Sequence, residues 1–186
     1  SDELERLIRD GLAAHPVDCL GLTGIREGLV LLDAAGRVLW VSGNALLDTE
    51  LLLDRDISGI DIGGFIPGIV ARNPQAHALL SLQGYVAYRL TGRRAITGSE
   101  LDALGLRRET NRRCPEVQRL LAPVEVVPVG TPLGQVGEAI ICLAGTDEQA
   151  SHHGAGIGTT ADLGLATATF WSLTAPARRA PTDLPQ

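Results

Sequence analysis

Residues 139–156, AIICLAGTDEQASHHGAG, constrain the fold most, because an apolar run there leads directly into a helix start. The stretch from Ala139 to Ala144 predicts a buried strand, which ends at Gly145. Thr146-Asp147-Glu148-Gln149 then matches the capping-box pattern of a helix N-terminus. A strand followed at once by a helix is typical of α/β sheets, which bind ligands outside the carboxyl ends of their strands. Asp147 is therefore placed where a functional carboxylate is expected.

Asp147 has two interpretations on local sequence. At a strand end, its carboxylate could accept a proton from a substrate hydroxyl. Acidic residues are also favoured in the first turn of any helix, where they interact with unpaired N–H groups and with the helix dipole. Local sequence alone favours the structural interpretation, so the choice depends on the rest of the chain.

Length and composition indicate one domain and exclude several classes of partner. The chain has 186 residues, of which 45% are hydrophobic, enough to bury one core. The net charge of −6 gives no basic surface for nucleic acid, and no Lys/Arg block indicates membrane binding. No apolar run approaches the ~18 residues of a membrane span, and the charged start SDELERLIRD does not resemble a signal peptide. Three irregularly spaced cysteines, Cys19, Cys114 and Cys142, predict reduced thiols and a cytoplasmic protein.

Hydrophobic periodicity predicts the other elements. A first helix begins at Asp2 and has one apolar face. A hairpin over 28–41 turns at Ala34-Ala35-Gly36, so Arg26 and Glu27 lie at its entrance. Further helices are expected over 45–53, from Asn73-Pro74 to a stop at Gly92, over 101–106 and over 115–121, and strands over 19–22, 124–127, 136–143 and 163–173.

Five segments, in the same order, resemble the FGGY carbohydrate kinases, the group that includes glycerol kinase, xylulokinase and the autoinducer kinases. Gly145-Thr146-Asp147-Glu148-Gln149, followed by Gly154-Ala155-Gly156, resembles the catalytic-aspartate segment of that family. The other four are Thr23–Asp33, similar to an early substrate strand with an Arg-Glu pair, Gly84–Gly92, similar to a helix ending in Leu-Thr-Gly, Val129–Gly134, similar to a Gly-Thr-x-Leu-Gly link, and Ala166–Trp171, similar to the phosphate loop. Because all five occur in register across residues 20 to 173, they are more specific together than any one alone.

The resemblance implies an actin-like, ribonuclease H-like α/β domain with a mixed sheet flanked by helices. It also implies transfer of the γ-phosphoryl of ATP, with Mg²⁺, to a hydroxyl of a sugar or polyol. In this alignment Asp147 matches the residue that accepts the hydroxyl proton. The other matched positions are Arg26, Glu27 and Glu148 for substrate binding, and Thr167 and Ala168 for phosphate binding. The nucleotide is expected to be held largely by a second domain outside this sequence.

The chain also departs from the family pattern. It has Ala166-Thr167-Ala168 where the family has Gly-Thr-Ser or Gly-Thr-Gly, and the added methyl groups hinder close approach of backbone N–H groups to a phosphate. No Asp-x-Gly-Thr hairpin precedes Ser1 in the sequence, so the kinase-like domain expected at 1–173, followed by a Pro-rich tail at 174–186, is incomplete by the family pattern. Either the chain is a reduced relative of the family, or the missing segments belong to a longer protein. These departures favour a noncatalytic sugar-binding pseudokinase or regulatory relic, whereas Asp147 favours an active kinase.

Three further points concern a metal site, a third function and the oligomeric state. His152 and His153 are adjacent on an expected helix and point in different directions, without zinc-ligand spacing nearby, so no metal site is expected. A bare α/β interaction domain is a third functional interpretation. The oligomeric state stays open, with a homodimer among the alternatives.

Overall fold

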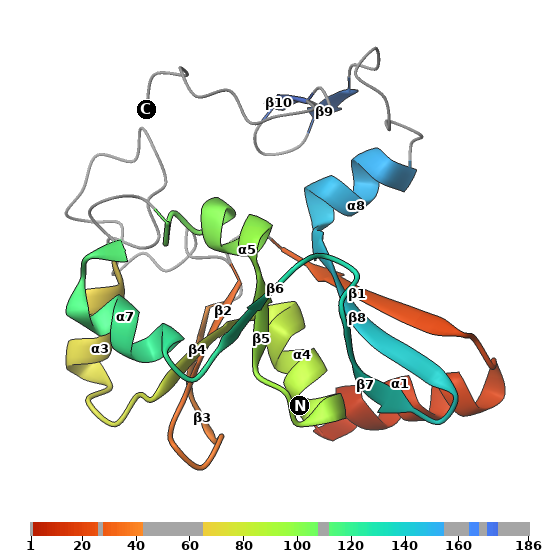
Figure 1. Cartoon of the computed structure of the whole chain (residues 1–186), viewed down its shortest axis with the longest axis horizontal. Helices are drawn as coiled ribbons and strands as arrows, with labels where there is room; N and C mark the ends of the chain where they lie inside the picture. The colour runs from red at the N-terminus through yellow and green to blue at the C-terminus, as the bar shows by residue number, and fades with distance from the viewer. Residues whose placement is uncertain are drawn as a thin grey trace. The chain divides into compact units, whose positions relative to one another are not determined.

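A computed structural model describes residues 2–25, 28–42, 65–107, 112–154, 164–167 and 171–174 of the chain. It divides the chain into two units, Ser1–Thr146 and Asp147–Gln186. The predicted domain range 1–173 stays a prediction. The predicted helix over 45–53 lies outside the described residues, as does the predicted tail over 174–186 except for Thr174, which ends β10. The elements of the first unit, drawn in Figure 1, are α1 (Asp2–Ala14), β1 (Cys19–Gly24), β2 (Leu29–Leu32), β3 (Val38–Ser42), α3 (Ile66–Arg72), β4 (Ala78–Ser81), α4 (Leu82–Thr91), β5 (Ala95–Thr97), α5 (Gly98–Ala103), α7 (Pro115–Leu121), β6 (Glu125–Val127), β7 (Pro132–Val136) and β8 (Ala139–Thr146).

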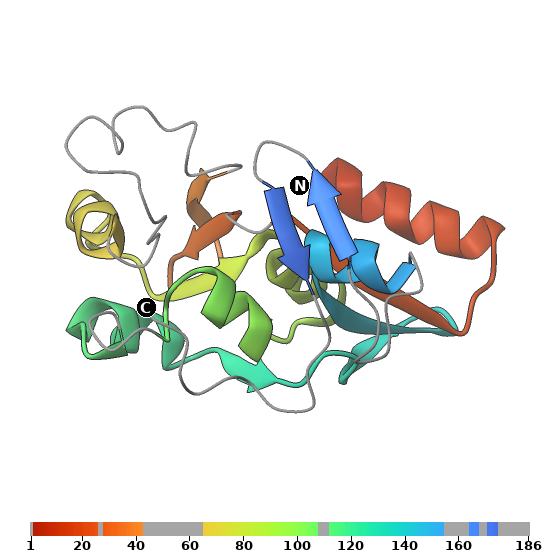
Figure 2. The same ribbon diagram turned by 90° about the horizontal axis from the view of Figure 1, so that it is seen from above.

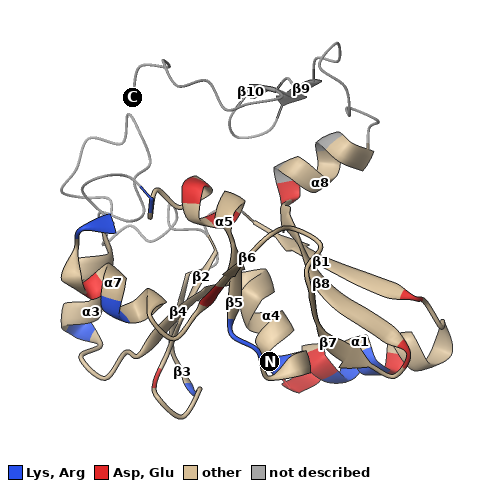
Figure 3. Ribbon diagram, viewed as in Figure 1, with Lys and Arg blue, Asp and Glu red and all other residues tan. Residues whose placement is uncertain are grey.

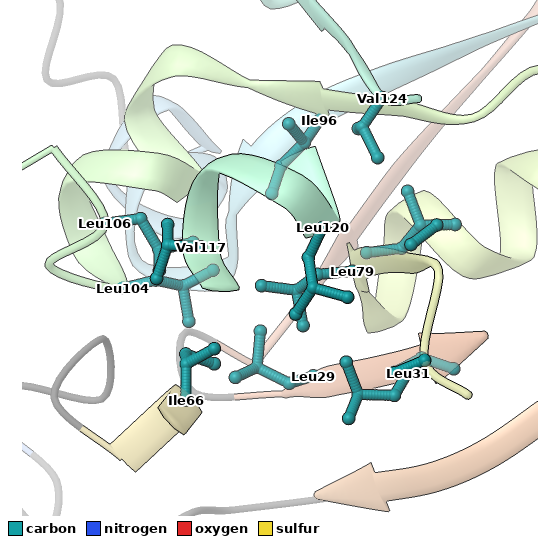
Figure 4. Close-up of a cluster of buried hydrophobic side chains, with 14 of the residues drawn as sticks. Leu29, Leu31, Ile66, Leu79, Ile96, Leu104, Leu106, Val117, Leu120 and Val124 are labelled. Carbon is teal, nitrogen blue, oxygen red and sulfur yellow. The ribbon is translucent and has the colours of Figure 1, made fainter. Parts of the chain in front are cut away.

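The largest core surrounds an antiparallel sheet of order β3-β2-β4. All four residues of β2 are buried because this central strand has neighbours on both sides and helices nearby. Figure 4 shows Leu29 and Leu31 of β2 with Leu79 of β4 and Leu120 of α7 in one cluster of apolar side chains. The predicted hairpin over 28–41 is confirmed, with Gly36 at φ +81° in its turn.

The long helix predicted from Asn73 begins later than expected. Residues 78–81 instead form β4, which pairs with β2 from Leu29↔Ser81 to Leu32↔Ala78. This pairing buries the apolar residues of β4 completely, and tertiary context therefore overrides their helical periodicity. Helix α4 starts only after Ser81, whose side chain caps Gly84 N–H, and it ends at Gly92 as predicted.

A second, mixed sheet has the order β1-β8-β7. β1 runs parallel to β8, and β7 runs antiparallel to it. Helix α4 lies between this sheet and the β3-β2-β4 sheet (Figures 1 and 2), and its Ala87 and Leu90 pack against Leu143 and Ile141 of β8 in two smaller clusters. The strand predicted over 136–143 is thus divided into the end of β7 and the longer β8.

The remaining predictions for this unit are met with shifted boundaries. Helix α5 begins at Gly98, three residues before the predicted start, because Thr97 caps it. α7 matches the predicted range 115–121, and β6 pairs in parallel with β5. Helix α1 carries acidic and basic residues along its length (Figure 3) and contacts α4 through Arg89, which donates to Asp2 at 2.7 Å and to Glu5 at 2.9 Å.

The second unit contains helix α8 (Asp147–Gly154) and two strands, β9 (Gly164–Thr167) and β10 (Trp171–Thr174). β9 and β10 pair antiparallel, with Thr167 opposite Trp171. The single β-rich run predicted over 163–173 is therefore a strand pair. Taken together, the described elements confirm the predicted mixed α/β class, although the strands are distributed over small sheets of two or three strands.

Candidate functional site

The carboxyl ends of β1 and β8 lie side by side. The two parallel strands stay in register from Cys19↔Ile140 to Leu22↔Leu143, and after an irregularity Gly24 pairs with Thr146. The Thr23 hydroxyl donates to the carbonyl of Gly145 at 3.1 Å and so joins the two ends. Gly145 has φ +83°, a backbone conformation that side chains disfavour. Two strands that are far apart in sequence therefore end next to each other in the sheet (Figure 1).

Asp147 comes immediately after the end of β8 in the sequence. β8 ends at Thr146 and α8 begins with Asp147, which confirms the predicted strand-to-helix junction. The Asp147 side chain is exposed. The predicted capping box at Thr146 and Gln149 stays a prediction. The junction puts a carboxylate one residue beyond a strand end, as the sequence indicates.

Arg26 and Glu27 follow the paired end of β1 in the same way, two and three residues after Gly24. Both lie outside the described residues. Their described neighbours are joined to each other, because Gly28 N–H donates to the Ile25 carbonyl at 3.3 Å. The strand end that precedes the predicted Arg-Glu pair and the strand end that precedes Asp147 are thus neighbours in the sheet.

The other predicted positions are described only in part. Glu148 lies in α8 and Thr167 ends β9, but their side chains are outside the described set, as is Ala168 altogether. His152 and His153 both fall in α8. Within the described ranges no three His, Cys, Asp or Glu side chains gather as metal ligands.

Gly28 anchors the far side of the predicted Arg-Glu segment to α4. Its carbonyl accepts from Leu82 N–H at 3.2 Å. A Cβ on this residue would collide with the Leu82 side chain, which would have to move to make room for it. The N-terminus of α4 therefore fixes where the chain enters β2.

A buried carboxylate holds the N-termini of α4 and α5 together. Glu100 is 1% exposed, and it accepts from the Ser81 hydroxyl at 2.6 Å and from Thr97 N–H at 2.6 Å. Thr97 accepts in return from Glu100 N–H, which completes a capping box. The sequence prediction missed this group, although Thr97-x-x-Glu100 carries the capping-box pattern that could have revealed it.

A cavity of about 320 Å³ lies between α1 and α4, beside the end of β1. Its lining is mainly apolar and includes Leu4, Val30 and Leu82. The Gln83 side chain also lines it, and its buried Oε1 atom has no hydrogen-bond partner. A polyhydroxylated ligand would lose its hydrogen bonds to water in so apolar a space. The apolar lining of this cavity is therefore poorly suited to a sugar.

Asp33 fixes the turn of the hairpin that follows the predicted Arg-Glu pair. Its carboxylate accepts from the backbone N–H of Arg37 at 2.9 Å and from the Arg37 guanidinium at 2.7 Å. These bonds, chiefly the one from the backbone, hold the pKa of Asp33 below its usual value. The side chain thus stabilises the hairpin in its ionised form.

No protein-family model and no curated protein matches the chain. Solved structures of carbohydrate kinases are similar to it. The chain is 19% identical to the xylulose kinase from Rhodospirillum rubrum, with a TM-score of 0.66 over 87% of this chain and 43% of that one. It is 21% identical to a carbohydrate kinase from Novosphingobium aromaticivorans, with a TM-score of 0.66 over 95% and 47%. For the gluconate kinase from Lactobacillus acidophilus the identity is 13% and the TM-score 0.67, over 92% and 43%.

These similarities establish the fold. The chain spans less than half the length of each of these structures. None of the described helices has the length and apolar character to cross a membrane. The described chain has the mixed α/β, actin-like fold found in solved structures of sugar kinases.

Proposed function

We propose that this chain is the sugar-binding, N-terminal-like region of an FGGY-type carbohydrate kinase, and that Asp147 is the general base of phosphoryl transfer to a sugar or polyol. The observation that carries the proposal is the pairing of Gly24 with Thr146. It makes neighbours of the two strand ends that lead to Arg26-Glu27 and to Asp147. Similarity to sugar-kinase structures supports the same reaction class.

Each proposed residue has a role that follows from its chemistry. The Asp147 carboxylate accepts the proton of the attacking hydroxyl, and this matters because the hydroxyl must become a better nucleophile as the new P–O bond forms. Arg26 donates and Glu27 accepts, a combination suited to two neighbouring hydroxyls of a polyol. Glu148 adds an acceptor next to the base. In this way the substrate is oriented by one strand end and activated from the other.

ATP supplies the phosphoryl group and is accompanied by Mg²⁺, which neutralises phosphate charge. We assign Thr167 and Ala168 to phosphate binding because their segment resembles the phosphate loop of the family, and Thr167 is the last residue of β9. The larger part of the nucleotide is held by a second domain in this proposal.

The test is sugar-dependent release of ADP by the native protein that contains this chain, with a panel of pentoses, hexoses and polyols. Asp147→Asn should lower kcat by about 10²–10⁴-fold. The matched control is Glu138→Gln, because Glu138 is an exposed acid at the opposite end of the same strand. The kinase proposal fails if no sugar gives turnover, or if both variants lose activity equally.

A noncatalytic sugar-binding protein is the second candidate, favoured by Ala166 and Ala168 at the predicted phosphate loop. It predicts sugar-dependent thermal stabilisation that Arg26→Ala abolishes, without any ADP release. Stabilisation and Asp147-dependent turnover together would reject it. Absence of both would leave only the α/β interaction domain.

A further inference from the structure

Two thiols lie in contact between β1 and β8, where Cys19 is the first residue of β1 and Cys142 the fourth residue of β8. The Sγ atoms of Cys19 and Cys142 are 3.6 Å apart, although 123 positions separate the residues in sequence. Cys142 pairs with Gly21, and a Cβ built there would lie 4.0 Å from the Cys142 sulfur. At 3.6 Å the two sulfurs are in direct contact, with no room for another atom between them.

The two thiols differ in access to solvent. Cys19 is exposed and is the first residue of β1, whereas Cys142 is only 7% exposed. Burial, together with the contact to Cys19, raises the pKa of Cys142. A dissolved oxidant therefore meets Cys19 first, while Cys142 stays protonated and protected.

Formation of the bond requires a backbone movement of β1, because Cys19 pairs with Ile140 and so lies diagonal to Cys142. A disulfide requires an S–S distance of about 2.05 Å, so the present separation must shorten by roughly 1.5 Å. Among the described strands β1 pairs only with β8, and it is therefore an edge strand. Cys19 at its start directly follows the irregular segment 15–18. Rotation of the Cys19 side chain with a shift of this strand end supplies the movement.

We propose that Cys19 and Cys142 form a peroxide-sensitive dithiol that oxidises to an intrachain disulfide. In the first step the Cys19 thiolate attacks hydrogen peroxide: an S–O bond forms, the O–O bond breaks, and the departing hydroxide is protonated to water. In the second step the Cys142 sulfur, as it gives up its proton, attacks the Cys19 sulfur: the S–S bond forms, the S–O bond breaks, and a second water leaves. Peroxide is reduced, and both thiols are oxidised.

The cross-link would fasten an edge strand to the centre of its sheet. It joins the start of β1 to the middle of β8, away from the Gly24 and Thr146 pair. A disulfide that closes so long a loop restricts the unfolded chain strongly, and it should raise Tm by roughly 10 °C. This proposal is independent of the proposed kinase function.

The experiment treats the purified native protein with hydrogen peroxide and maps the cysteines by mass spectrometry. Cys114 is the matched control, because it is a third, partly exposed thiol that donates to Glu116. After peroxide treatment, the mass of the Cys114→Ser variant should fall by two hydrogen atoms, and its digest should contain a Cys19–Cys142 cross-linked peptide. Its Tm should rise, and dithiothreitol should restore the starting mass. Cys142→Ala should instead stop at a Cys19 sulfenic acid that dimedone traps.

Three results would overturn the proposal. One is over-oxidation of Cys19 in Cys114→Ser without a disulfide. Another is a disulfide that joins two chains or includes Cys114 in the wild-type protein. The third is a cross-link that forms without any rise in Tm, which would contradict the fastening of β1. Because the wild-type protein is mapped as well, the result does not depend on whether any variant folds.

Discussion

The Ser81 hydroxyl donates to the Glu100 carboxylate at 2.6 Å, and both side chains are almost fully buried. Ser81 caps α4 and Glu100 belongs to the first turn of α5, so one contact joins the starts of two helices. Ser81 also pairs with Leu29, next to Gly28. The Ser81–Glu100 contact therefore helps to hold Gly28, just before the start of β2, in position.

Glu100→Ala should lower the free energy of unfolding by about 2–4 kcal/mol, because it removes two hydrogen bonds and leaves Thr97 N–H buried without an acceptor. Glu100→Gln should cost less, since the amide oxygen can still accept from Thr97. Urea denaturation measures both. Asp102→Ala is the control, an exposed acid of the same helix that should change stability little. Equal losses of unfolding free energy in Glu100→Ala and Asp102→Ala would show that the burial of Glu100 does not make its hydrogen bonds more stabilising.

Two helical glycines should respond to alanine in opposite ways. A Cβ on Gly84 would lie 2.7 Å from the backbone oxygen of Ala95 and 2.9 Å from the Ser81 hydroxyl, so Gly84→Ala should destabilise by about 1–3 kcal/mol. Gly11 lies within α1 and has open space around it, so Gly11→Ala should stabilise by about 0.5–1 kcal/mol. Thermal unfolding of the two variants compares them. If both variants became more stable, or both less stable, close packing of α4 on β5 would not be what determines the effect of alanine at Gly84.

The depressed pKa of Asp33 predicts a stability that depends on pH. Because its folded-state pKa is below the unfolded value of ~3.9, its contribution is present above that pH and is lost as pH falls through the folded pKa. The gap in stability between wild type and Asp33→Asn should therefore close in acid. Urea denaturation from neutral pH to pH ~3 measures it. A gap that stays constant would argue against the shift.

The source of that shift can be tested separately. The strongest cause is the backbone N–H of Arg37, which survives any substitution of that side chain except proline. In Arg37→Ala the pKa of Asp33 should stay below ~3.9, with only a partial rise. Carbon-detected NMR titration of the Asp33 carboxyl measures this. A complete return to the ordinary value would assign the effect to the guanidinium instead.

Thr23→Val should weaken the joint between the two strand ends, because it removes the hydrogen bond to Gly145 while keeping the side-chain shape. We expect a loss of about 1 kcal/mol in stability and weaker sugar binding by the native protein. Thr91→Val is the matched control, since the Thr91 hydroxyl bonds only near the end of its own helix, where it donates to the Ala87 carbonyl and accepts from Arg93 N–H. Calorimetric titration should show weaker sugar binding for Thr23→Val alone. Equal sugar affinities in the two variants would show that the Thr23–Gly145 hydrogen bond does not affect the proposed sugar site.

Local sequence was sufficient for elements whose signals are contiguous. The β8–α8 junction follows from an apolar run next to a helix start, and the hairpin at 28–41 follows from two β-rich runs around Gly36. The end of α4 at Gly92 follows from a glycine that adopts positive φ. Asp147 and the paired Arg26 and Glu27 were chosen from sequence, and the roles of all three remain predictions.

Only the tertiary structure decided which distant segments meet. Residues 78–81 have a helical pattern but form β4, because pairing with β2 buries them more completely than a helix end would. Three contacts join segments that lie apart in sequence, and local propensities cannot predict which such segments meet. They are Ser81–Glu100, Cys19–Cys142 and the Gly24–Thr146 pair. Sequence fixes local geometry through backbone and capping preferences, whereas burial and strand register depend on the partner that each element finds in the folded chain.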